Sequence, residues 1–340
     1  MKHDIRILTL VFLLLWALAW SSAGRASATD EPPENFVPVD EPTAIAEAEQ
    51  PGTPDTERIL RVLHGGTVEE MTMRDYLQGV LRAEMPASFE LEALKAQAIA
   101  ARTYTLHKMS GGAIANHPDA DACDDVNCCK AYKTAEDAAA DWGSMALYYE
   151  EKLARAIAET DGQAILYNGE PILAVFFSSS GGHTQNAGAV WQTDLPYLQS
   201  VSSPEDETLV PNYYSVARFS ASEFRSLFLR AHPEAELSGT VDSWIRDVVR
   251  SDANYVTSLR VGGVTVKGNE LRSILSLRSP SFTVKTEGDT LVFHVTGYGH
   301  GVGMSQYGAN ALAIDGMDAA AILEHYFPGA QVRGYQTPTL

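Results

Sequence analysis

A lone glutamate, Glu84, stands between two helical patterns and is the side chain best placed for acid chemistry. Pro86 disfavours a helical conformation at Met85, so the first helix is expected to end near Glu84. A carboxylate at a helix C-terminus faces the negative end of the dipole, and burial raises its pKa further. A general acid that donates a proton near neutral pH needs such a raised pKa. The local pattern alone favours a plainer interpretation, in which Glu84 is an exposed side chain.

A second group of chemically capable residues is His117, Cys123, Cys128 and Cys129, which holds every cysteine of the chain. One imidazole and three thiolates make a full tetrahedral set for zinc. In an exported protein, the competing interpretation is one disulfide plus a free thiol. Soft thiolates favour zinc, and four protein ligands leave no open position for water. We therefore expect a structural ion, and a zinc hydrolase built on this cluster is disfavoured.

Two further segments place polar side chains on glycine-rich backbone. Around Ser178, Ser180 and His183 there is no Gly-x-Ser-x-Gly elbow, so a hydroxyl-rich loop lining a groove is expected rather than a nucleophile. Residues 297–303 alternate glycine with other residues but lack the Lys-Ser/Thr ending of a phosphate loop. These glycines are expected to let the backbone approach a groove. The side chains they would present are His300, Ser305, Gln306 and Tyr307.

Several other side chains have two interpretations. Lys95 and Arg102 are seven residues apart on nearly one helix face, so they could orient a substrate or tune Glu84. Alternatively, Lys95 pairs with Glu92 and Arg102 with a structural carboxylate. Tyr197, like Trp191, could stack on a sugar face, although aromatic side chains more often belong to a core. His300 is likewise either a substrate contact or a core histidine.

The elements that must position these residues have local signals. Thr72 followed by Asp75 predicts the start of the first helix, and Ser88 is expected to cap the second, Ala-rich helix, which stops at Gly111. Asn168-Gly169 between apolar runs predicts a hairpin of residues 164–167 and 172–177. Ser220 and Glu223 form a capping-box pattern that opens a helix through about Ala231. Further strands are expected at 58–63, 245–249, 256–261, 264–266 and 282–285, with a tight turn at Gly262-Gly263.

Composition and the N-terminus set the broad class. A net charge of -19 without a basic stripe argues against nucleic acid as a partner. Basic residues precede an apolar run at 7–20, which is short for a spanning helix, and Ala26-Ser27-Ala28 offers a cleavage site. Residues 1–28 are therefore expected to be a signal peptide or a membrane anchor, and the bulk of the chain is expected to lie outside the cytoplasmic membrane.

The remaining chain predicts an α+β protein with two domains. Residues 29–57 are an acidic, Pro-rich stretch expected to be a disordered linker. A main domain of mixed helices and strands is predicted for 58–203 and 291–335, and a smaller α+β domain is inserted at 204–290.

Three separated blocks of sequence resemble the stage II sporulation protein D (SpoIID) family. The first is the Glu84 elbow with its Ala-rich helix, and the second runs from Tyr167 through the Ser178–Thr184 loop to Leu198. The third begins at Gly299-His300 and continues through Gln306 to Tyr326. The match covers nearly all of residues 60–330, and three blocks in the expected order make it specific.

The resemblance implies a lytic transglycosylase, which cleaves the MurNAc-β-1,4-GlcNAc bond of peptidoglycan and leaves a 1,6-anhydro-MurNAc end. Hydrolytic glycosidases usually need two carboxylates. Here the C6 hydroxyl of the substrate attacks, so one glutamate can serve, and the resemblance makes Glu84 that catalytic residue. The residues assigned to substrate binding are Lys95, Arg102, Ser178, Ser180, His183, Tyr197, His300, Ser305, Gln306 and Tyr307.

The family also implies a biological setting. Its members degrade septal glycan during engulfment in endospore formation, on strands stripped of stem peptides by a partner amidase, SpoIIP, and they are anchored in the membrane. Some clostridial members carry zinc on His, Cys, His and Cys, whereas this chain has Cys128 where the second His would fall. A rival from a different class is the amidase enhancer of the LytB type, which binds cell wall without cleaving it.

Overall fold

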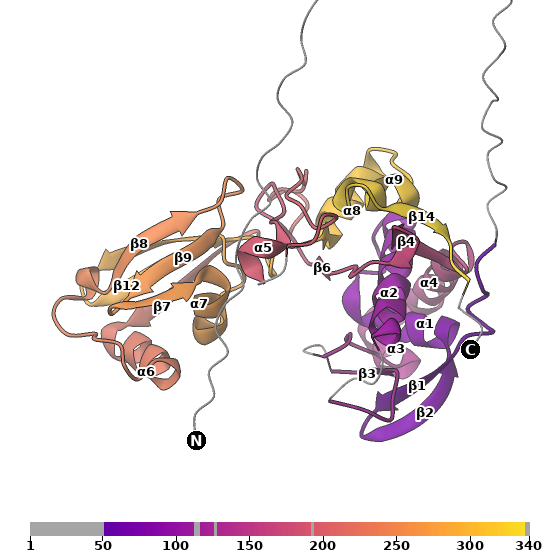
Figure 1. The fold of residues 1–340 in the computed structure, drawn as a ribbon, viewed down its shortest axis with the longest axis horizontal. Coiled ribbons are helices and arrows are strands. Elements are labelled where there is room, and N and C mark those ends of the chain that lie inside the picture. Colours follow the sequence, from indigo (N-terminus) through magenta and orange to yellow (C-terminus); the bar gives the residue numbers. More distant parts are fainter. Residues whose placement is uncertain (1–50, 112–115, 126–127, 192–193, 337–340) are drawn as a thin grey trace, which may run out of the picture. The chain divides into compact units, whose positions relative to one another are not determined.

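The computed structural model describes residues 51–111, 116–125, 128–191 and 194–336, and it has the expected α+β fold (Figure 1). The helices are α1 Met73–Glu84, α2 Leu91–Ser110, α3 Ala135–Trp142, α4 Ala146–Ala158, α5 Ala187–Val190, α6 Ala221–Ala231, α7 Gly268–Leu275, α8 Gln306–Ile314 and α9 Ala319–Tyr326. The strands are β1 Ile59–His64, β2 Thr67–Thr72, β3 Ala122–Cys123, β4 Gln163–Tyr167, β5 Glu170–Pro171, β6 Phe176–Phe177, β7 Tyr214–Ser220, β8 Ile245–Arg250, β9 Val256–Val261, β10 Val264–Lys267, β11 Phe282–Glu287, β12 Thr290–Thr296, β13 Met304–Ser305 and β14 Gln331–Gly334.

The signal peptide or anchor predicted at residues 1–28, and the linker predicted for 29–57 as far as residue 50, lie outside the described residues. Within the described part of the chain, no helix combines the length and the apolar character needed to cross a membrane.

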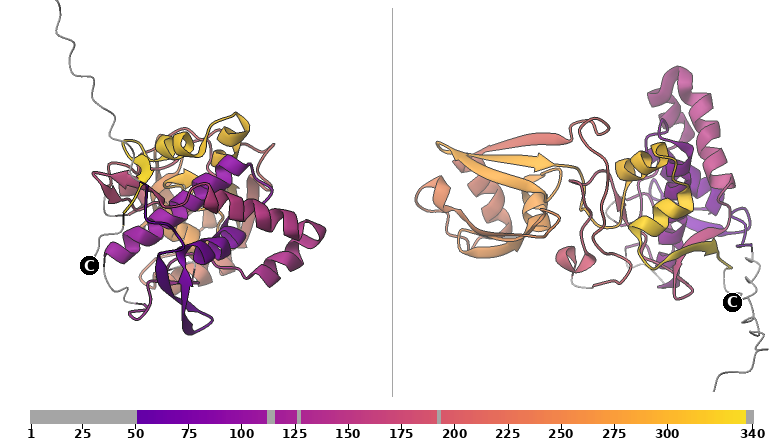
Figure 2. Two further views of the ribbon diagram at one scale, coloured as in Figure 1. Left: turned by 90° about the vertical axis from the view of Figure 1, so that its right-hand side faces the viewer. Right: turned by 90° about the horizontal axis from the view of Figure 1, so that it is seen from above.

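Helix α2 is the centre of the first hydrophobic core. It packs against α1, α4, α8, α9 and β4, and the left view of Figure 2 shows α8 and α9, in yellow, beside it. A helix contacted on so many sides must be apolar nearly all round. The alanines of α2, such as Ala96 and Ala100, are fully buried and let the neighbouring helices approach closely.

The elbow between α1 and α2 forms largely as the sequence predicts. Thr72 caps α1 by accepting a hydrogen bond from the Asp75 N–H, and α1 ends at Glu84 because Met85 before Pro86 is extended. The predicted cap at Ser88 is wrong: α2 begins at Leu91 after Glu90, with no side-chain cap. The Glu90 N–H donates instead to Asn310 Oδ1 of α8, at 2.8 Å. The start of α2 is therefore fixed by a tertiary contact.

The predicted hairpin is confirmed at its turn and wrong in its second strand. Asn168 and Gly169 have φ of 53° and 85°, as a tight hairpin turn requires, and β5 pairs with β4. The Ile172 N–H still donates to the Ile165 carbonyl of β4 at 3.1 Å, but residues 173–177 do not continue that strand. Only β6, Phe176–Phe177, is paired, and its parallel partner is the distant β13. This pairing places the second and third sequence blocks side by side.

A second hydrophobic core lies between residues 217 and 295. It contains the capping-box helix α6, where Ser220 and Glu223 cap each other as expected, and the sheet β10-β9-β8 with its Gly262-Gly263 turn. The sheet β11-β12-β7 completes it (Figure 1). The division into a main and an inserted domain stays a prediction, and the separate core supports it. The predicted inserted domain ends at residue 290, but this core also includes β12, most of which follows that residue.

Residues 51–57, at the end of the predicted linker, pack on the fold. Asp55 and Arg102 of α2 form an ion pair in which neither side chain is exposed, with Arg102 Nε 2.8 Å from Asp55 Oδ1. Arg102 also donates to the Gln163 carbonyl at 3.1 Å. Nearby, the Thr53 N–H donates to the Tyr335 carbonyl at 3.0 Å, just after β14. A buried guanidinium needs such a partner, and this need explains why the acidic segment is ordered here.

We expect Asp55→Ala to destabilise the fold by about 3–5 kcal/mol, because it leaves the Arg102 guanidinium buried without its carboxylate. Glu287→Ala is a matched control that breaks an exposed pair with Arg218, and it should change stability little. Urea unfolding followed by circular dichroism measures both variants. If Asp55→Ala unfolds at the same urea concentration as the control, the buried pair does not have this role.

Candidate functional site

A cavity of about 620 Å³ contains Glu84, within the size range of small-ligand pockets. The polar side chains that line it come from α1 (Arg82, Glu84), the β6 region (Ser178), the segment after α7 (Arg278), the residue just before the third block (Tyr298) and the third block itself (Gln306, Tyr307). Apolar and aromatic groups such as Trp142 and Phe176 complete the wall. Among the described residues that line the cavity, Glu84 is the single carboxylic acid.

Glu84 is held by its backbone and by its side chain. It is the last residue of α1, and its free carbonyl accepts a hydrogen bond from Gln306 Nε2 at 2.9 Å. This contact ties the elbow to the first residue of α8. One carboxyl oxygen, Oε1, accepts from the Ala131 N–H at 3.1 Å. The side chain is thereby oriented by a donor from the loop before α3.

Burial raises the pKa of Glu84 above that of an ordinary glutamate, against the opposing effects of the Lys130 charge and the Ala131 N–H. Lys130 lies between two rings, with Nζ 3.9 Å from the Tyr104 centroid and 3.7 Å from that of Phe176. Burial lowers the pKa of Lys130 to about 8 although Glu84 acts to raise it. Burial therefore shifts Glu84 towards its protonated form relative to an exposed glutamate, which is the direction that a general acid requires.

A second buried carboxyl group, Glu205, holds the loops around the cavity. It accepts hydrogen bonds from the Ser180 N–H at 2.6 Å, from Ser203 Oγ at 2.6 Å and from Ser305 Oγ. Ser305 also caps α8 by accepting from the Gly308 N–H. A Cβ at position 308 would lie 2.1 Å from Tyr326 Oη, so only glycine fits there. This network fixes the start of α8 and therefore the Gln306 contact to Glu84.

Three of the ten predicted substrate residues line the cavity: Ser178, Gln306 and Tyr307. The Tyr307 ring packs edge-on against Phe89, with the ring centroids 4.9 Å apart, and the Tyr307 N–H donates to the Ser178 carbonyl. Ser180 and Ser305 are buried in the Glu205 network and do not reach the cavity wall. Ser180 and Ser305 therefore hold the loops that form the cavity wall and do not line the cavity themselves.

The other five lie outside the cavity wall. Lys95 pairs with Glu92 at 2.8 Å and with Glu159, and Arg102 pairs with Asp55, as their structural interpretations predict. Tyr197 is buried, and its hydroxyl accepts from the Leu173 N–H at 3.2 Å. The side chain of His183 is exposed.

His300 lies between the rings of Phe177 and Trp191, with centroid distances of 5.6 and 5.7 Å. Burial lowers its pKa to about 4, and the Lys130 and Arg272 charges add to the effect. His300 is therefore neutral at physiological pH.

Sequence reasoning missed four functional candidates on the cavity wall: Arg82, Trp142, Arg278 and Tyr298. Arg82 stands in the elbow itself and Tyr298 directly precedes Gly299, so both could have been found next to known motifs. Trp142 and Arg278 belong to no motif, and only the fold brings them to the cavity.

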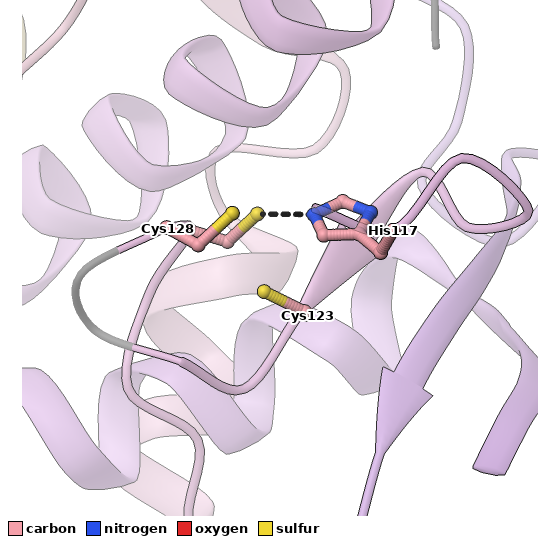
Figure 3. A group of neighbouring side chains, drawn as sticks. His117, Cys123 and Cys128 are labelled. Atoms are coloured by element: carbon pink, nitrogen blue, oxygen red, sulfur yellow. Dashed lines mark hydrogen bonds between the residues drawn. The ribbon is translucent and has the colours of Figure 1, made fainter. Parts of the chain in front are cut away.

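The His117, Cys123, Cys128 and Cys129 cluster could bind a metal such as zinc. Their donor atoms all lie within 4.8 Å of one another, and Figure 3 shows the labelled side chains converging. His117 Nε2 is 3.2 Å from Cys129 Sγ, while its Nδ1 is 2.9 Å from the Ala120 carbonyl. A ligating histidine usually donates its second ring N–H to such an acceptor. All three cysteines are free thiols, and three members of the cluster are buried.

The matching family model and two similar proteins agree, since each bears the description of a stage II sporulation protein. The family model SpoIID, described as stage II sporulation protein, matches residues 64–167. Stage II sporulation protein D of Bacillus subtilis (strain 168) is 37% identical over 269 residues, covering 78% of this chain and 76% of the relative. The protein of the same name from Bacillus amyloliquefaciens is 36% identical, covering 78% and 75%. The amidase enhancer of Bacillus subtilis is 29% identical over 306 residues, covering 76% of this chain and 40% of that protein.

We expect the protein purified with reductant to carry about one zinc ion per chain, since a four-ligand N/S site fits one tetrahedral ion. Cys123→Ser should lower both the zinc content and the melting temperature, whereas His294→Asn, an exposed histidine outside the cluster, should change neither. Elemental analysis and thermal unfolding measure these quantities. Zinc-free protein after purification with reductant would contradict the assignment.

We expect Glu84→Gln to stabilise the protein at neutral pH. The folded-state pKa of Glu84 is raised, so its contribution to stability is present below the unfolded-state pKa and is lost as pH rises through the folded-state value. The glutamine mimics the protonated acid, so the gain over wild type should shrink at acidic pH. Thermal unfolding across pH, with exposed Glu207→Gln as control, measures this difference. A gain that does not depend on pH would rule out the raised pKa.

Proposed function

Because the chain belongs to the SpoIID family, we propose that it is a lytic transglycosylase that cleaves MurNAc-β-1,4-GlcNAc bonds in peptidoglycan strands lacking stem peptides. The observation that carries the proposal is the cavity in which Glu84 is the single acid among the described lining residues. A hydrolytic glycosidase usually needs a second carboxylate to activate water or to attack the sugar. A reaction in which the substrate supplies its own nucleophile needs one acid/base group.

In the proposed reaction, protonated Glu84 donates its proton to the glycosidic oxygen as the bond to C1 of MurNAc breaks. The C6 hydroxyl of the same sugar then attacks C1, and the Glu84 carboxylate accepts the hydroxyl proton. The 1,6-anhydro ring forms, the GlcNAc end leaves as an alcohol, and Glu84 is protonated again. The raised pKa of Glu84 supports the first step, and its Ala131 and Gln306 contacts support a fixed orientation.

We extend the proposal to the biological process and the location in which the protein acts. The names of the relatives indicate sporulation, and we place the protein in septal wall degradation during engulfment, with an amidase of the SpoIIP type supplying strands without stem peptides. The predicted N-terminal segment would hold it outside the cytoplasmic membrane, as an anchor or, if cleaved, as a secretion signal. The metal cluster lies outside the cavity lining, so we assign zinc a structural role.

A second candidate function is that of a cell-wall-binding amidase enhancer without cleavage. The similarity to the amidase enhancer of Bacillus subtilis favours it. The two functions share a glycan-binding cavity and differ in whether a product forms.

We expect the purified protein to release fragments with 1,6-anhydro-MurNAc ends from peptide-free glycan strands, and Glu84→Gln to abolish this release because the proton donor is lost. Mass spectrometry of the products separates the outcomes. Glu207→Gln is a matched control that should keep the wild-type yield. Products with reducing ends would indicate a hydrolase, and no product from a glycan-binding protein would indicate the enhancer. Unchanged anhydro product from Glu84→Gln would remove Glu84 from the mechanism.

A further inference from the structure

Arg278 brings to the cavity wall a guanidinium group that forms no ion pair within the described part of the chain. It stacks on the Tyr298 ring, with the guanidinium carbon 4.2 Å from the ring centroid. Its Nε is buried and has no hydrogen-bond partner among the residues that the structure describes. A buried donor without an acceptor costs free energy, so this group is expected to have an acceptor in the functional state.

Other arginines of the protein contrast with Arg278. Arg82, on the same cavity wall, is bound to Glu150, with Nε 3.0 Å from Oε2. In the second core, Arg250 and Arg225 donate to backbone carbonyls at 2.6 and 2.8 Å. Each of these guanidinium groups has a structural partner. Among the described residues, the Arg278 guanidinium has the Tyr298 ring as its contact and no ion pair, so its donors remain for a ligand.

The surroundings of Arg278 suit an anion attached to a sugar. A smaller cavity of about 290 Å³ shares Arg278 and Tyr298 with the main one. Its other polar lining residues are Arg272, Ser273 and Ser276, with no acid among the described lining residues. Tyr298 is 44% exposed, and its ring offers a flat surface on which a sugar ring can lie. Cations and hydroxyl donors thus adjoin the cavity that holds Glu84.

We propose that Arg278 binds the lactyl carboxylate of MurNAc, with Tyr298 as the stacking platform for the sugar. This inference rests on the proposed function and names the chemical group by which a strand without stem peptides is distinguished. A guanidinium matches a carboxylate with two parallel N–H···O bonds, and such charge-assisted pairs are stronger than neutral ones.

The same contact accounts for the need to remove the stem peptide first. In an intact strand the lactyl group is joined to the peptide by an amide, which carries no charge and adds bulk. Amidase cleavage converts that amide into the free carboxylate. Because the protein carries a net charge of -19, an anionic glycan is repelled at long range, and a local cation is needed to hold it.

Binding is measured in the Glu84→Gln background, so that turnover plays no part. The probes are a GlcNAc–MurNAc oligosaccharide with free lactyl carboxylates, the same molecule as its methyl ester, and a chitin oligosaccharide of equal length. We expect the acid form to bind about tenfold or more tightly than the ester, as for one charge-assisted pair. Adding Arg278→Gln should remove this preference, Arg278→Lys should keep part of it, and exposed Arg260→Gln should keep it fully.

The outcomes separate the two proposals. Equal loss of acid, ester and chitin binding in Arg278→Gln, or an acid preference that survives the substitution, overturns the role of Arg278 and leaves the proposed function standing. Binding of the chitin probe should be unchanged in Arg278→Gln, which also shows that the variant is folded. If Glu84→Gln binds none of the glycans, the proposed function fails, and this inference fails with it.

Discussion

The hydrogen bonds to the buried Glu205 carboxyl group are the constraint on which the site depends. They connect the loop after β6, the segment before β7 and the start of α8, which are far apart in the sequence. Because Ser305 serves both Glu205 and the N-terminus of α8, the position of Gln306 follows from this network. Gln306 in turn holds the carbonyl of Glu84. The acid is therefore positioned by a chain of contacts that begins at a different buried carboxyl group.

Glu205, which is buried, and Glu84, which is partly exposed, show how environment assigns different roles to identical side chains. Glu205 is surrounded by donors and serves the fold, whereas Glu84 has one backbone donor to its carboxyl group and faces a cavity. Desolvation without full hydrogen bonding is what raises the pKa of Glu84. The charge of Lys130, whose ammonium group lies against the Tyr104 and Phe176 rings, lowers the pKa of Glu84 and so limits that rise. An acid that must release and recover a proton is best served by such a balance.

Local signals in the sequence were sufficient wherever a few neighbouring residues decide the conformation. Thr72 with Asp75, Asn168 with Gly169, and Ser220 with Glu223 predicted their elements because caps and tight turns are local. Ser88 failed as a cap because Asn310 supplies the acceptor from another part of the chain. The predicted strand at 172–177 failed for a related reason, since the partner of β6 is β13. Trp142 and Arg278 reach the cavity through tertiary structure, which no spacing rule encodes.

The contacts between residues 51–58 and the segment after β14 bear on how the protein folds. Thr53 donates to the Tyr335 carbonyl, and β14 pairs with β4, which itself packs on α2. These pairings join residues far apart in the sequence, so closure of this part of the core is expected to be slow. During synthesis, which proceeds from the N-terminus, this part of the core cannot be completed until residues 331–335 have left the ribosome. During that interval the apolar surface of α2 is open, and a folding chain in this state is prone to aggregation.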